Sequence, residues 1–113
     1  MPKGDFVGEF ELYVMLALAH LGEEAYGIAI RQEIEARTGR SVAIGAVYAT
    51  LGRLEDKHQV TFRVSQPRPV PGGRSRKHYR LTPLGERALA HSTEMIGRMM
   101  AGLTRRVRPE RSR

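Results

Sequence analysis

Hydrophobic residues recur at helical spacing in three segments along the first half of the chain. The first segment, residues 8–20, is the most apolar, and Gly22 follows it as a glycine of the kind that commonly ends a helix. In the second segment, residues 25–37, apolar side chains return every fourth position. The third segment, residues 41–57, begins with Ser41, a favourable N-cap residue. Because the gaps between the segments are short, we expect the three helices to pack against one another.

The second and third predicted helices each have one apolar face. In the second helix this face comprises Tyr26, Ile30 and Ile34, and in the third helix it comprises Ile44, Val47, Leu51 and Leu54. Residues at this spacing share one side of a helix, so the two faces are the candidate core of the domain.

After the third helix the period of the pattern changes to two, which is typical of half-buried strands. Apolar and polar residues alternate over residues 60–65 and again over residues 77–81. The prolines between these runs cannot donate to a strand ladder, and Gly72 and Gly73 permit a tight turn. The pattern therefore predicts a β-hairpin with a protruding loop.

A fourth helix is predicted to begin at Thr82 and Pro83, with Thr82 as the N-cap and Pro83 at the first helical position. It is expected to extend over residues 83–107 and to have an apolar stripe in its second half. Residues 108–113 have no packing signal, and we expect them to form a disordered basic tail.

Three helices, a hairpin and a further helix, in this order, indicate a winged helix-turn-helix. We therefore expect a mainly α fold with a small β-hairpin. Residues 5–82 would form the DNA-binding domain and residues 83–107 a C-terminal dimerisation helix. In this fold the third helix enters the major groove, and the hairpin wing lies along the backbone or the minor groove.

The charge of the chain is unevenly distributed. The net charge is +7, but residues 1–57 hold six Lys and Arg against nine Asp and Glu, a net of −3. Residues 58–113 hold thirteen against three, a net of +10. This asymmetry favours a polyanion partner, and the alternative is a solvated basic face without a partner.

The third predicted helix carries small and cationic residues beside its apolar face. A stripe opposite the core is predicted for Ala46, Thr50, Arg53 and Lys57, with Gly45, Ala49 and Gly52 beside it. Arg53 can reach a guanine edge or a phosphate, and Thr50 can reach either. The alternative is a helix face that contacts only solvent. In that case each of the two glycines would lower the stability of the helix by about 1 kcal/mol relative to alanine without any compensating contact.

The predicted wing is strongly basic. No acidic residue occurs between Arg68 and Arg80, a stretch that includes Arg74, Arg76 and Lys77. Extended cationic side chains around a glycine turn suit phosphate or narrow-groove binding. The alternative is a mobile surface loop whose charge serves only to keep it soluble.

Three blocks of sequence, in this order, are more specific than the general pattern. They are Ala25-Tyr26-Gly27, Val47-Tyr48-Ala49-Thr50-Leu51 and Tyr79-Arg80-Leu81-Thr82-Pro83-Leu84-Gly85. With these blocks the chain resembles the short form of the PadR family of transcriptional regulators over about residues 8–90. The resemblance implies a homodimeric regulator, often a repressor, that binds a palindromic operator. It also implies that Tyr48 and its neighbours face DNA and that the wing tip approaches the duplex.

Two positions depart from the family pattern. Ala49 occurs where the family often has proline, and His58-Gln59 occurs where it usually has Gly-Leu. The family glycine caps the third helix, so the turn into Val60 is where a difference is expected.

The candidate site residues form two groups. The predicted DNA-binding residues are Ser41, Gly45, Ala46, Tyr48, Ala49, Thr50, Arg53, Lys57, Gly72, Gly73, Arg74, Arg76 and Lys77. The predicted dimer interface comprises Phe10, Met95, Ile96, Met99, Met100, Leu103 and Val107. An apolar stripe beyond the three-helix core requires a partner, and a second copy of the chain is the expected one.

Other chemistry is not indicated. The chain has no cysteine, its four histidines lack metal-ligand spacing, and no catalytic constellation is present. We therefore expect neither an enzyme nor a cofactor or metal site. The first residues lack the features of a signal peptide, and the apolar run at residues 10–21 is too short to cross a bilayer. A cytoplasmic protein without a membrane partner is expected.

The leading hypothesis is a sequence-specific DNA-binding regulator, and the alternative is a winged-helix protein-interaction module without specific DNA binding. The basic wing and the basic helix favour DNA. The operator, the regulated genes, the sign of regulation and any small-molecule effector are not readable from the sequence.

Overall fold

The computed structural model of the chain describes residues 7–66 and 75–103. The elements follow in the order α1 (Glu9–Leu21), the 3₁₀ helix η2 (Gly22–Glu24), α2 (Gly27–Thr38), α3 (Ile44–Asp56), β1 (Val60–Val64), β2 (Lys77–Leu81) and α4 (Pro83–Met100). The expected fold class, mainly α with a small β-hairpin and a C-terminal helix, is confirmed.

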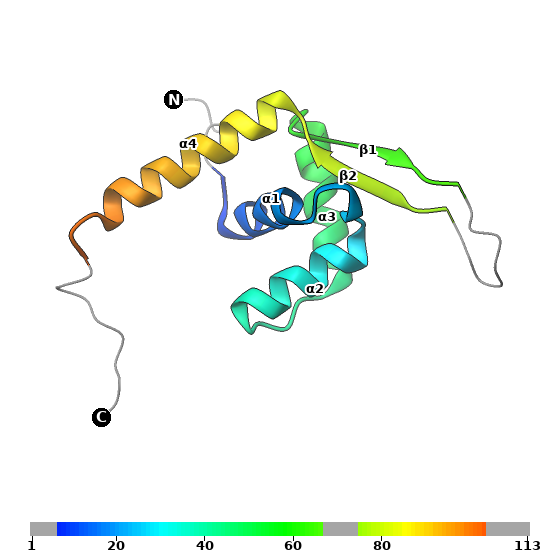
Figure 1. Ribbon diagram of the computed structural model, residues 1–113, viewed down its shortest axis with the longest axis horizontal. Coiled ribbons are helices and arrows are strands. Elements are labelled where there is room, and N and C mark those ends of the chain that lie inside the picture. The colour runs from blue at the N-terminus through cyan, green and yellow to red at the C-terminus, as the bar shows by residue number, and fades with distance from the viewer. Residues whose placement is uncertain (1–6, 67–74, 104–113) are drawn as a thin grey trace.

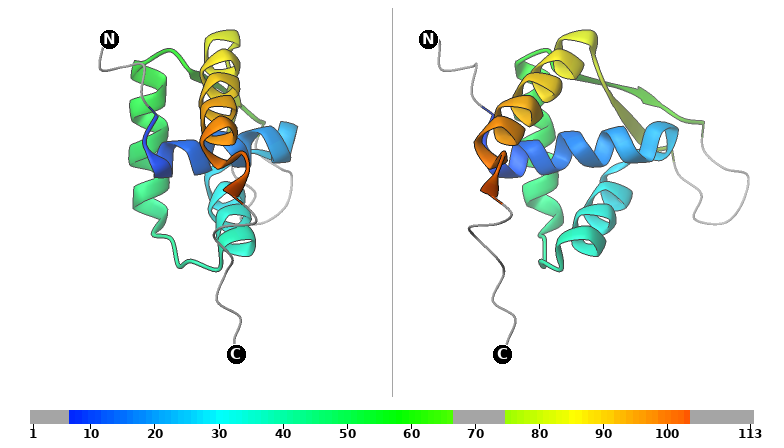
Figure 2. Two further views of the ribbon diagram at one scale, coloured as in Figure 1. Left: turned by 90° about the vertical axis from the view of Figure 1, so that its left-hand side faces the viewer. Right: turned by 60° about the vertical axis from the view of Figure 1, so that its left-hand side comes forward.

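The three helices α1, α2 and α3 pack together, and the hairpin extends from one end of this group (Figure 1). Strands β1 and β2 are antiparallel, with Val60 opposite Leu81 and Phe62 opposite Tyr79. Helix α4 returns across α1, and its C-terminal half extends beyond the other helices (Figures 1 and 2).

The core lies where the apolar faces of the three helices meet the base of the hairpin. Its buried members include Val14, Met15, Leu18, Ile30, Ile34, Val47, Leu51, Leu54, Val60 and Tyr79. The face predicted for the third helix is thus confirmed for Val47, Leu51 and Leu54, while Ile44 is partly buried against the same core.

Glycine follows two of the helices, as expected for Gly22, and proline begins α4 as expected. Gly22 and Gly39 follow α1 and α2 with left-handed φ angles of 59° and 74°. Before α4, the Thr82 hydroxyl accepts a hydrogen bond from the Gly85 N–H at 3.0 Å, and Pro83 occupies the first helical position.

Two helix starts differ from the prediction. Helix α3 begins at Ile44 with Ala43 as N-cap, so the prediction that Ser41 is the N-cap is wrong. The Glu35 carboxylate accepts a hydrogen bond from the Val42 N–H at 2.9 Å. This bond ties the connection between α2 and α3 to the last turns of α2.

Helix α2 begins at Gly27 and not near residue 25. The Ala25 carbonyl accepts a hydrogen bond from the Tyr79 N–H at 2.8 Å, which joins this segment to β2. Tyr26 is accordingly extended, with φ −104° and ψ 164°.

Helix α4 ends at Met100, earlier than the predicted end near residue 107. Ala101 leaves the helical conformation with ψ 129°, and Gly102 has a φ of 80°. Leu103 therefore lies beyond the helix, and Val107 lies outside the described residues.

The turn from α3 into β1 is built on His58, the position of the family glycine. Its φ is 61°, in the left-handed region that an L-residue with a side chain seldom adopts. The His58 N–H donates to the Glu55 carbonyl and the Gln59 N–H donates to the Leu54 carbonyl, both at 2.9 Å. This is the hydrogen-bond pattern of a glycine-capped helix end, so the turn is retained and histidine takes the glycine conformation.

Helix α4 is attached to this turn by close backbone contact. The Thr82 N–H donates to the Gln59 carbonyl at 3.0 Å, and the Thr82 hydroxyl donates to the His58 carbonyl at 2.7 Å. A Cβ atom at Gly85 would lie 2.0 Å from the Gln59 carbonyl oxygen. The first turn of α4 can therefore approach the end of α3 only because residue 85 is glycine.

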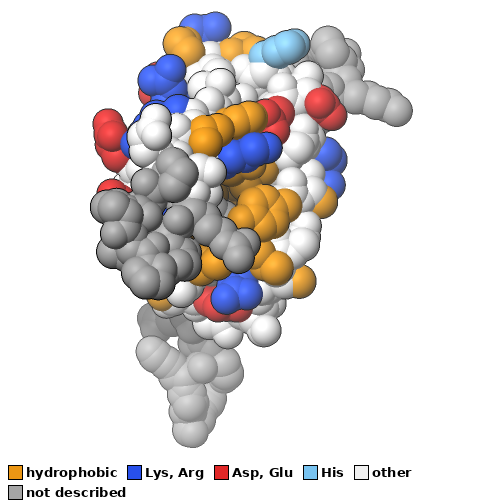
Figure 3. Space-filling view, turned by 90° about the vertical axis from the view of Figure 1, so that its right-hand side faces the viewer, with side chains coloured by type: hydrophobic (Ala, Val, Ile, Leu, Met, Phe, Trp, Pro, Cys, Tyr) orange, Lys and Arg blue, Asp and Glu red, His pale blue; other side chains and the backbone are white. Residues whose placement is uncertain are grey.

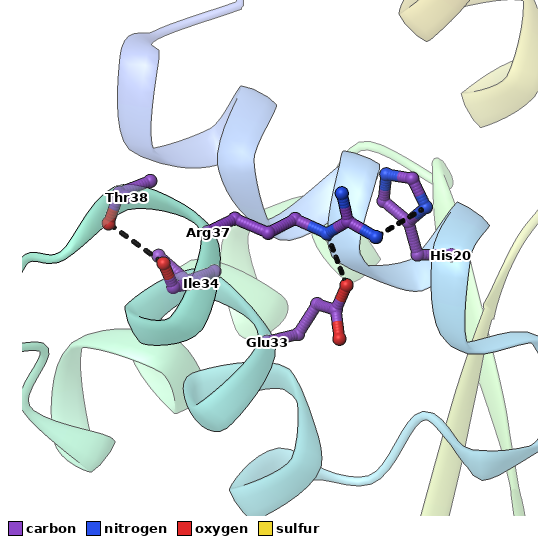
Figure 4. Close-up of polar contacts among 5 residues, drawn as sticks. All are labelled: His20, Glu33, Ile34, Arg37 and Thr38. Carbon is purple, nitrogen blue, oxygen red and sulfur yellow. Dashed lines mark hydrogen bonds and ion pairs between the residues drawn. The ribbon is translucent and has the colours of Figure 1, made fainter.

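A polar contact links α1 and α2 at the surface. Arg37 of α2 pairs with Glu33 one turn earlier, and its Nη2 lies 3.3 Å from Nδ1 of His20 at the end of α1 (Figure 4). The Thr38 hydroxyl donates to the Ile34 carbonyl at 2.8 Å in the last turn of α2.

Candidate nucleic-acid interface

Along most of its length, the surface of α3 that points away from the core is made of small residues, and the exposed Asp56 lies at its end. At 100° per residue, Gly45, Ala49 and Gly52 lie opposite Val47, Leu51 and Leu54. Among the described residues, a Cβ atom at Gly45 or at Gly52 would meet no atom within 4 Å, so their packing does not require glycine at either position. These residues form a ridge over which another molecule can approach the helix backbone.

The cationic stripe predicted opposite the core lies on the flank of α3 that faces α1. Thr50, which belongs to this stripe, is only 1% exposed. The expectation that Thr50 reaches DNA is therefore wrong for this structure. The physical reason is its angle around the helix axis: residue 50 is about 60° from the centre of the buried face, so it lies on the buried side of α3.

Arg53 and Lys57, on the same flank, both pair with Glu11 of α1. The Lys57 ammonium donates to Oε1 of Glu11 at 2.9 Å, and Nε of Arg53 lies 3.5 Å from Oε2. Nη2 of Arg53 also donates to the Thr50 hydroxyl at 2.9 Å. The Arg53 side chain nevertheless remains 55% exposed, while that of Lys57 is 32% exposed.

Tyr48 occupies the opposite flank of α3. It is 48% exposed, and its ring lies against Gly27, at the start of α2. Ala46, predicted to contact DNA, is also exposed, as is Ser41 in the connection before α3. The outer surface of α3 thus offers a bare ridge, a tyrosine on one flank and an arginine on the other.

Two cations at the base of the wing lie over aromatic rings. The Arg76 guanidinium is 4.2 Å from the centroid of the Tyr26 ring, and Nζ of Lys77 is 4.3 Å from the centroid of the Phe62 ring. Such cation–π contacts hold the side chains without neutralising their charge. Gly72, Gly73 and Arg74, the predicted tip residues, lie outside the described residues.

A second set of contacts fixes β2 to the segment before α2. His78 lies edge-on to Tyr26 with ring centroids 5.8 Å apart, and its Nδ1 is 3.0 Å from the Glu23 carbonyl oxygen. The Glu23 carboxylate in turn lies 3.5 Å from Nη2 of Arg63 on β1. Because Tyr26 contacts the wing and Gly27 contacts Tyr48, two adjacent residues connect the wing base to α3.

Tyr79 closes the wing base from the inside. Its ring packs against Phe62 with centroids 5.6 Å apart. Burial raises the pKa of the Tyr79 hydroxyl, and Glu55 and Tyr48 add to the effect. The hydroxyl therefore stays protonated, and the hairpin rests on a neutral aromatic pair.

The face at the hairpin end of the molecule combines hydrophobic side chains with Lys and Arg, and Asp and Glu side chains are also visible on it (Figure 3). An open groove of about 860 Å³ runs between α1, the hairpin and α4. Its lining combines apolar and charged side chains and includes Leu16, Phe62, Arg80 and Leu89.

The predicted dimer stripe is exposed along the second half of α4. Met99 is 82% exposed, and Ile96, Met100 and Leu103 are also exposed, whereas Met95 is half-buried. Phe10 is partly buried against the core of its own chain. Among residues 7–66 and 75–103, no element therefore covers Ile96, Met99, Met100 or Leu103.

Sequence reasoning missed Glu11. The signal was present, because Glu11 is the only carboxylate in the apolar run at residues 10–21. Such a residue requires a partner, but its partners are 42 and 46 positions away, and only the tertiary structure brings them together.

Among residues 7–66 and 75–103, no three His, Asp or Glu side chains come together as metal ligands. Within the same residues, no helix is long and apolar enough to span a membrane.

The chain is similar to proteins of one family. Residues 15–91 match the PadR-like family of transcriptional regulators. An uncharacterized protein of Lysinibacillus sphaericus is 36% identical over 92 residues, which are 74% of this chain and 82% of that protein.

Solved structures of two regulators have the same fold. A PadR-like transcriptional regulator from Bacillus cereus superposes with a TM-score of 0.69 at 19% identity, covering 89% of this chain and 93% of the other. A PadR family transcriptional regulator from Eggerthella lenta gives a TM-score of 0.62 at 26% identity, covering 89% of each chain.

These similarities agree with the exposed surface of α3 and the basic wing base. The family consists of transcriptional regulators, which agrees with the expectation that the chain is not an enzyme. The chain belongs to the PadR-like family of DNA-binding transcriptional regulators.

Proposed function

We propose that this chain is a repressor that binds a palindromic operator as a homodimer. Helix α3 would enter the major groove, and the hairpin would lie along the backbone or the minor groove. Two copies related by a two-fold axis would read half-sites about one helical turn apart.

The observation that carries this proposal is the bare ridge of α3. Gly45 and Gly52 have open space where a side chain would be, and each costs helix stability relative to alanine, by about 1 kcal/mol. Glycines that the chain's own packing does not need are explained by a partner that approaches the helix closely. The floor of the major groove is such a partner, because it admits an α-helix.

The residues beside the ridge have different roles in this proposal. Arg53 is the candidate for a guanine edge or a phosphate, since its side chain is largely exposed and directed by two contacts. Tyr48, Ala46 and Ala49 would make shape and apolar contacts. Thr50 would act through Arg53 and not on the bases.

The wing would contribute affinity more than sequence preference. Arg76 and Lys77 keep their charge over aromatic rings, so they suit phosphate contacts. Gly72, Gly73 and Arg74 remain candidates at the wing tip.

The dimer would form through the second half of α4, within the proposed dimerisation segment 83–107. Support comes from Ile96, Met99 and Met100, three large apolar side chains that are exposed on this one helix. Residues 108–113 remain a proposed basic tail.

The test is selection of binding sites from a random duplex library, followed by titrations of the selected operator and a scrambled duplex across a salt series. Arg53→Ala should weaken operator binding by about 1–3 kcal/mol and relax the preference at particular base pairs. Arg76→Ala with Lys77→Ala should weaken both duplexes alike and reduce the log–log salt slope by about 0.9 per lost contact.

Arg87→Ala is the matched control, because it removes an exposed arginine from α4, outside α3 and the wing. It should leave the ratio of the two affinities unchanged. If the wild-type chain selects no sequence and binds duplexes only weakly, the alternative of a protein-interaction module replaces this proposal.

A further inference from the structure

Glu11 is an acidic residue buried beside the surface proposed to meet a polyanion. It is 9% exposed, on the side of α1 that also buries Leu12, Met15 and Leu18. A buried carboxylate is tolerated only when it is paired and hydrogen-bonded. Its partners are Arg53 of α3 and Lys57, the C-cap residue of the same helix.

The pairing restrains the one long exposed cation on the outer part of that flank. Nε of Arg53 lies 3.5 Å from Glu11, and Nη2 donates to the buried Thr50 hydroxyl at 2.9 Å. A planar guanidinium held at two of its nitrogens has a defined direction. More than half of the side chain is still exposed, so the direction is set without removing the group from the surface.

The pairing also reduces the local charge. Arg53 and Lys57 together carry two positive charges, and Glu11 cancels one of them. Affinity for any duplex depends on the number of phosphates that cations neutralise. A cation that shares a carboxylate is therefore less available for contacts that ignore sequence.

We propose that Glu11 is a positioning residue that sets the sequence discrimination of the DNA interface. It directs Arg53 for contact with a base edge and limits the attraction of α3 for phosphates in general. This inference rests on the proposed function, in which α3 reads the operator.

The competing explanation is that the ion pair only fastens α1 to α3. In that case its loss would lower the stability of the fold, and the affinities for all duplexes would fall by the same factor. The ratio of operator affinity to scrambled-duplex affinity separates the two explanations, because a general weakening cancels in the ratio.

The experiment uses the full chain with Glu11→Gln, which retains the size of the side chain and an oxygen that can accept from Lys57. Affinities for the selected operator and a scrambled duplex are measured across a salt series, and thermal unfolding is followed by circular dichroism. Scrambled-duplex affinity should rise, by roughly fivefold per released cation at physiological salt, with a salt slope steeper by about 0.9 for each. The affinity ratio should fall by at least about fivefold.

Glu9→Gln is the matched control. It makes the same charge change on the same helix, but the Glu9 carboxylate contacts Tyr13 and Arg40 at the surface and not α3. Its affinity ratio should equal that of the wild type.

Glu11→Asp separates charge from geometry. It keeps the charge but withdraws the carboxylate by one methylene, so the salt slope should stay at the wild-type value while the ratio falls. If Glu11→Gln does not fold, this variant decides the question.

An unchanged ratio in the folded Glu11 variant, or equal weakening of both duplexes, overturns the role of Glu11 while leaving the proposed function intact. A wild-type chain that prefers no duplex overturns the proposed function itself.

Discussion

Gly27 and Tyr48 are in direct contact: a Cβ atom at residue 27 would lie 2.3 Å from the Tyr48 hydroxyl oxygen. The first residue of α2 thus leaves the space that the exposed tyrosine of α3 occupies. The two residues come from separate sequence blocks of the PadR-like pattern. Their contact explains why a glycine follows Tyr26, where no turn or positive φ requires one.

Gly27→Ala should displace the Tyr48 ring while leaving the fold intact. The atoms that the new methyl group meets belong to the end of a side chain that can rotate, so the free energy of unfolding should change by less than about 1 kcal/mol. Operator affinity should fall because Tyr48 leaves its position on the flank of α3. Titration of the operator and thermal unfolding, measured together, check this.

The control for Gly27→Ala is the same change in a Tyr48→Ala background. Without the ring there is nothing to displace, so the effect of Gly27→Ala on operator affinity should vanish. Equal effects in both backgrounds would show that residue 27 acts independently of Tyr48.

Gly85→Ala should destabilise the protein by about 1–3 kcal/mol. The added methyl group meets a backbone carbonyl, that of Gln59, which cannot rotate away, and the Thr82 hydrogen bonds hold the two segments together. Chemical denaturation measures the loss. Gly97→Ala, in open space on the same helix, should instead stabilise by about 0.5–1 kcal/mol through helix propensity. Similar effects at both positions would contradict the close contact.

His58→Gly should raise the free energy of unfolding by about 1 kcal/mol. The left-handed conformation costs an ordinary residue about 1–2 kcal/mol, and glycine adopts it freely. The net gain is smaller because glycine also gains freedom in the unfolded chain. His91→Gly, at an exposed position inside α4, should destabilise by a similar amount. Loss of stability in His58→Gly would mean that the histidine side chain contributes more than its backbone strain.

Met99→Glu should convert a dimer to a monomer at micromolar concentration, as measured by sedimentation equilibrium. Met99 is 82% exposed in the single chain, so the substitution should leave the fold of the monomer intact. In a packed interface, however, two buried and unpaired carboxylates would be strongly unfavourable. Leu84→Glu, an exposed apolar residue in the first turn of the same helix, should remain dimeric. A wild-type chain that is already monomeric would refute the proposed interface.

The order of elements and the core were predictable from the sequence because both depend on local periodicity. A helix repeats every 3.6 residues, so Val47, Leu51 and Leu54 identify the buried face of α3 without knowledge of any partner. Gly22, Gly39 and the Thr82-Pro83 pair mark helix ends through backbone preferences that act within a few residues.

Properties that depend on residues distant in sequence required the tertiary structure. Thr50 has the same local pattern as an exposed residue, yet it is buried in the fold. The partners of Glu11 are more than forty positions away. Ser41 is a good N-cap by propensity, but the contact of Glu35 with Val42 determines the path of the chain there.

The sequence by itself thus determined which segments are helices and strands, which of their faces are buried, and the family. The tertiary structure decided which residues beside the ridge of α3 are exposed and which side chains direct Arg53. The physical reason is the range of the interactions. Periodicity and capping act over one or two helical turns. Burial and ion pairing depend on which helix packs against the residue in the folded chain.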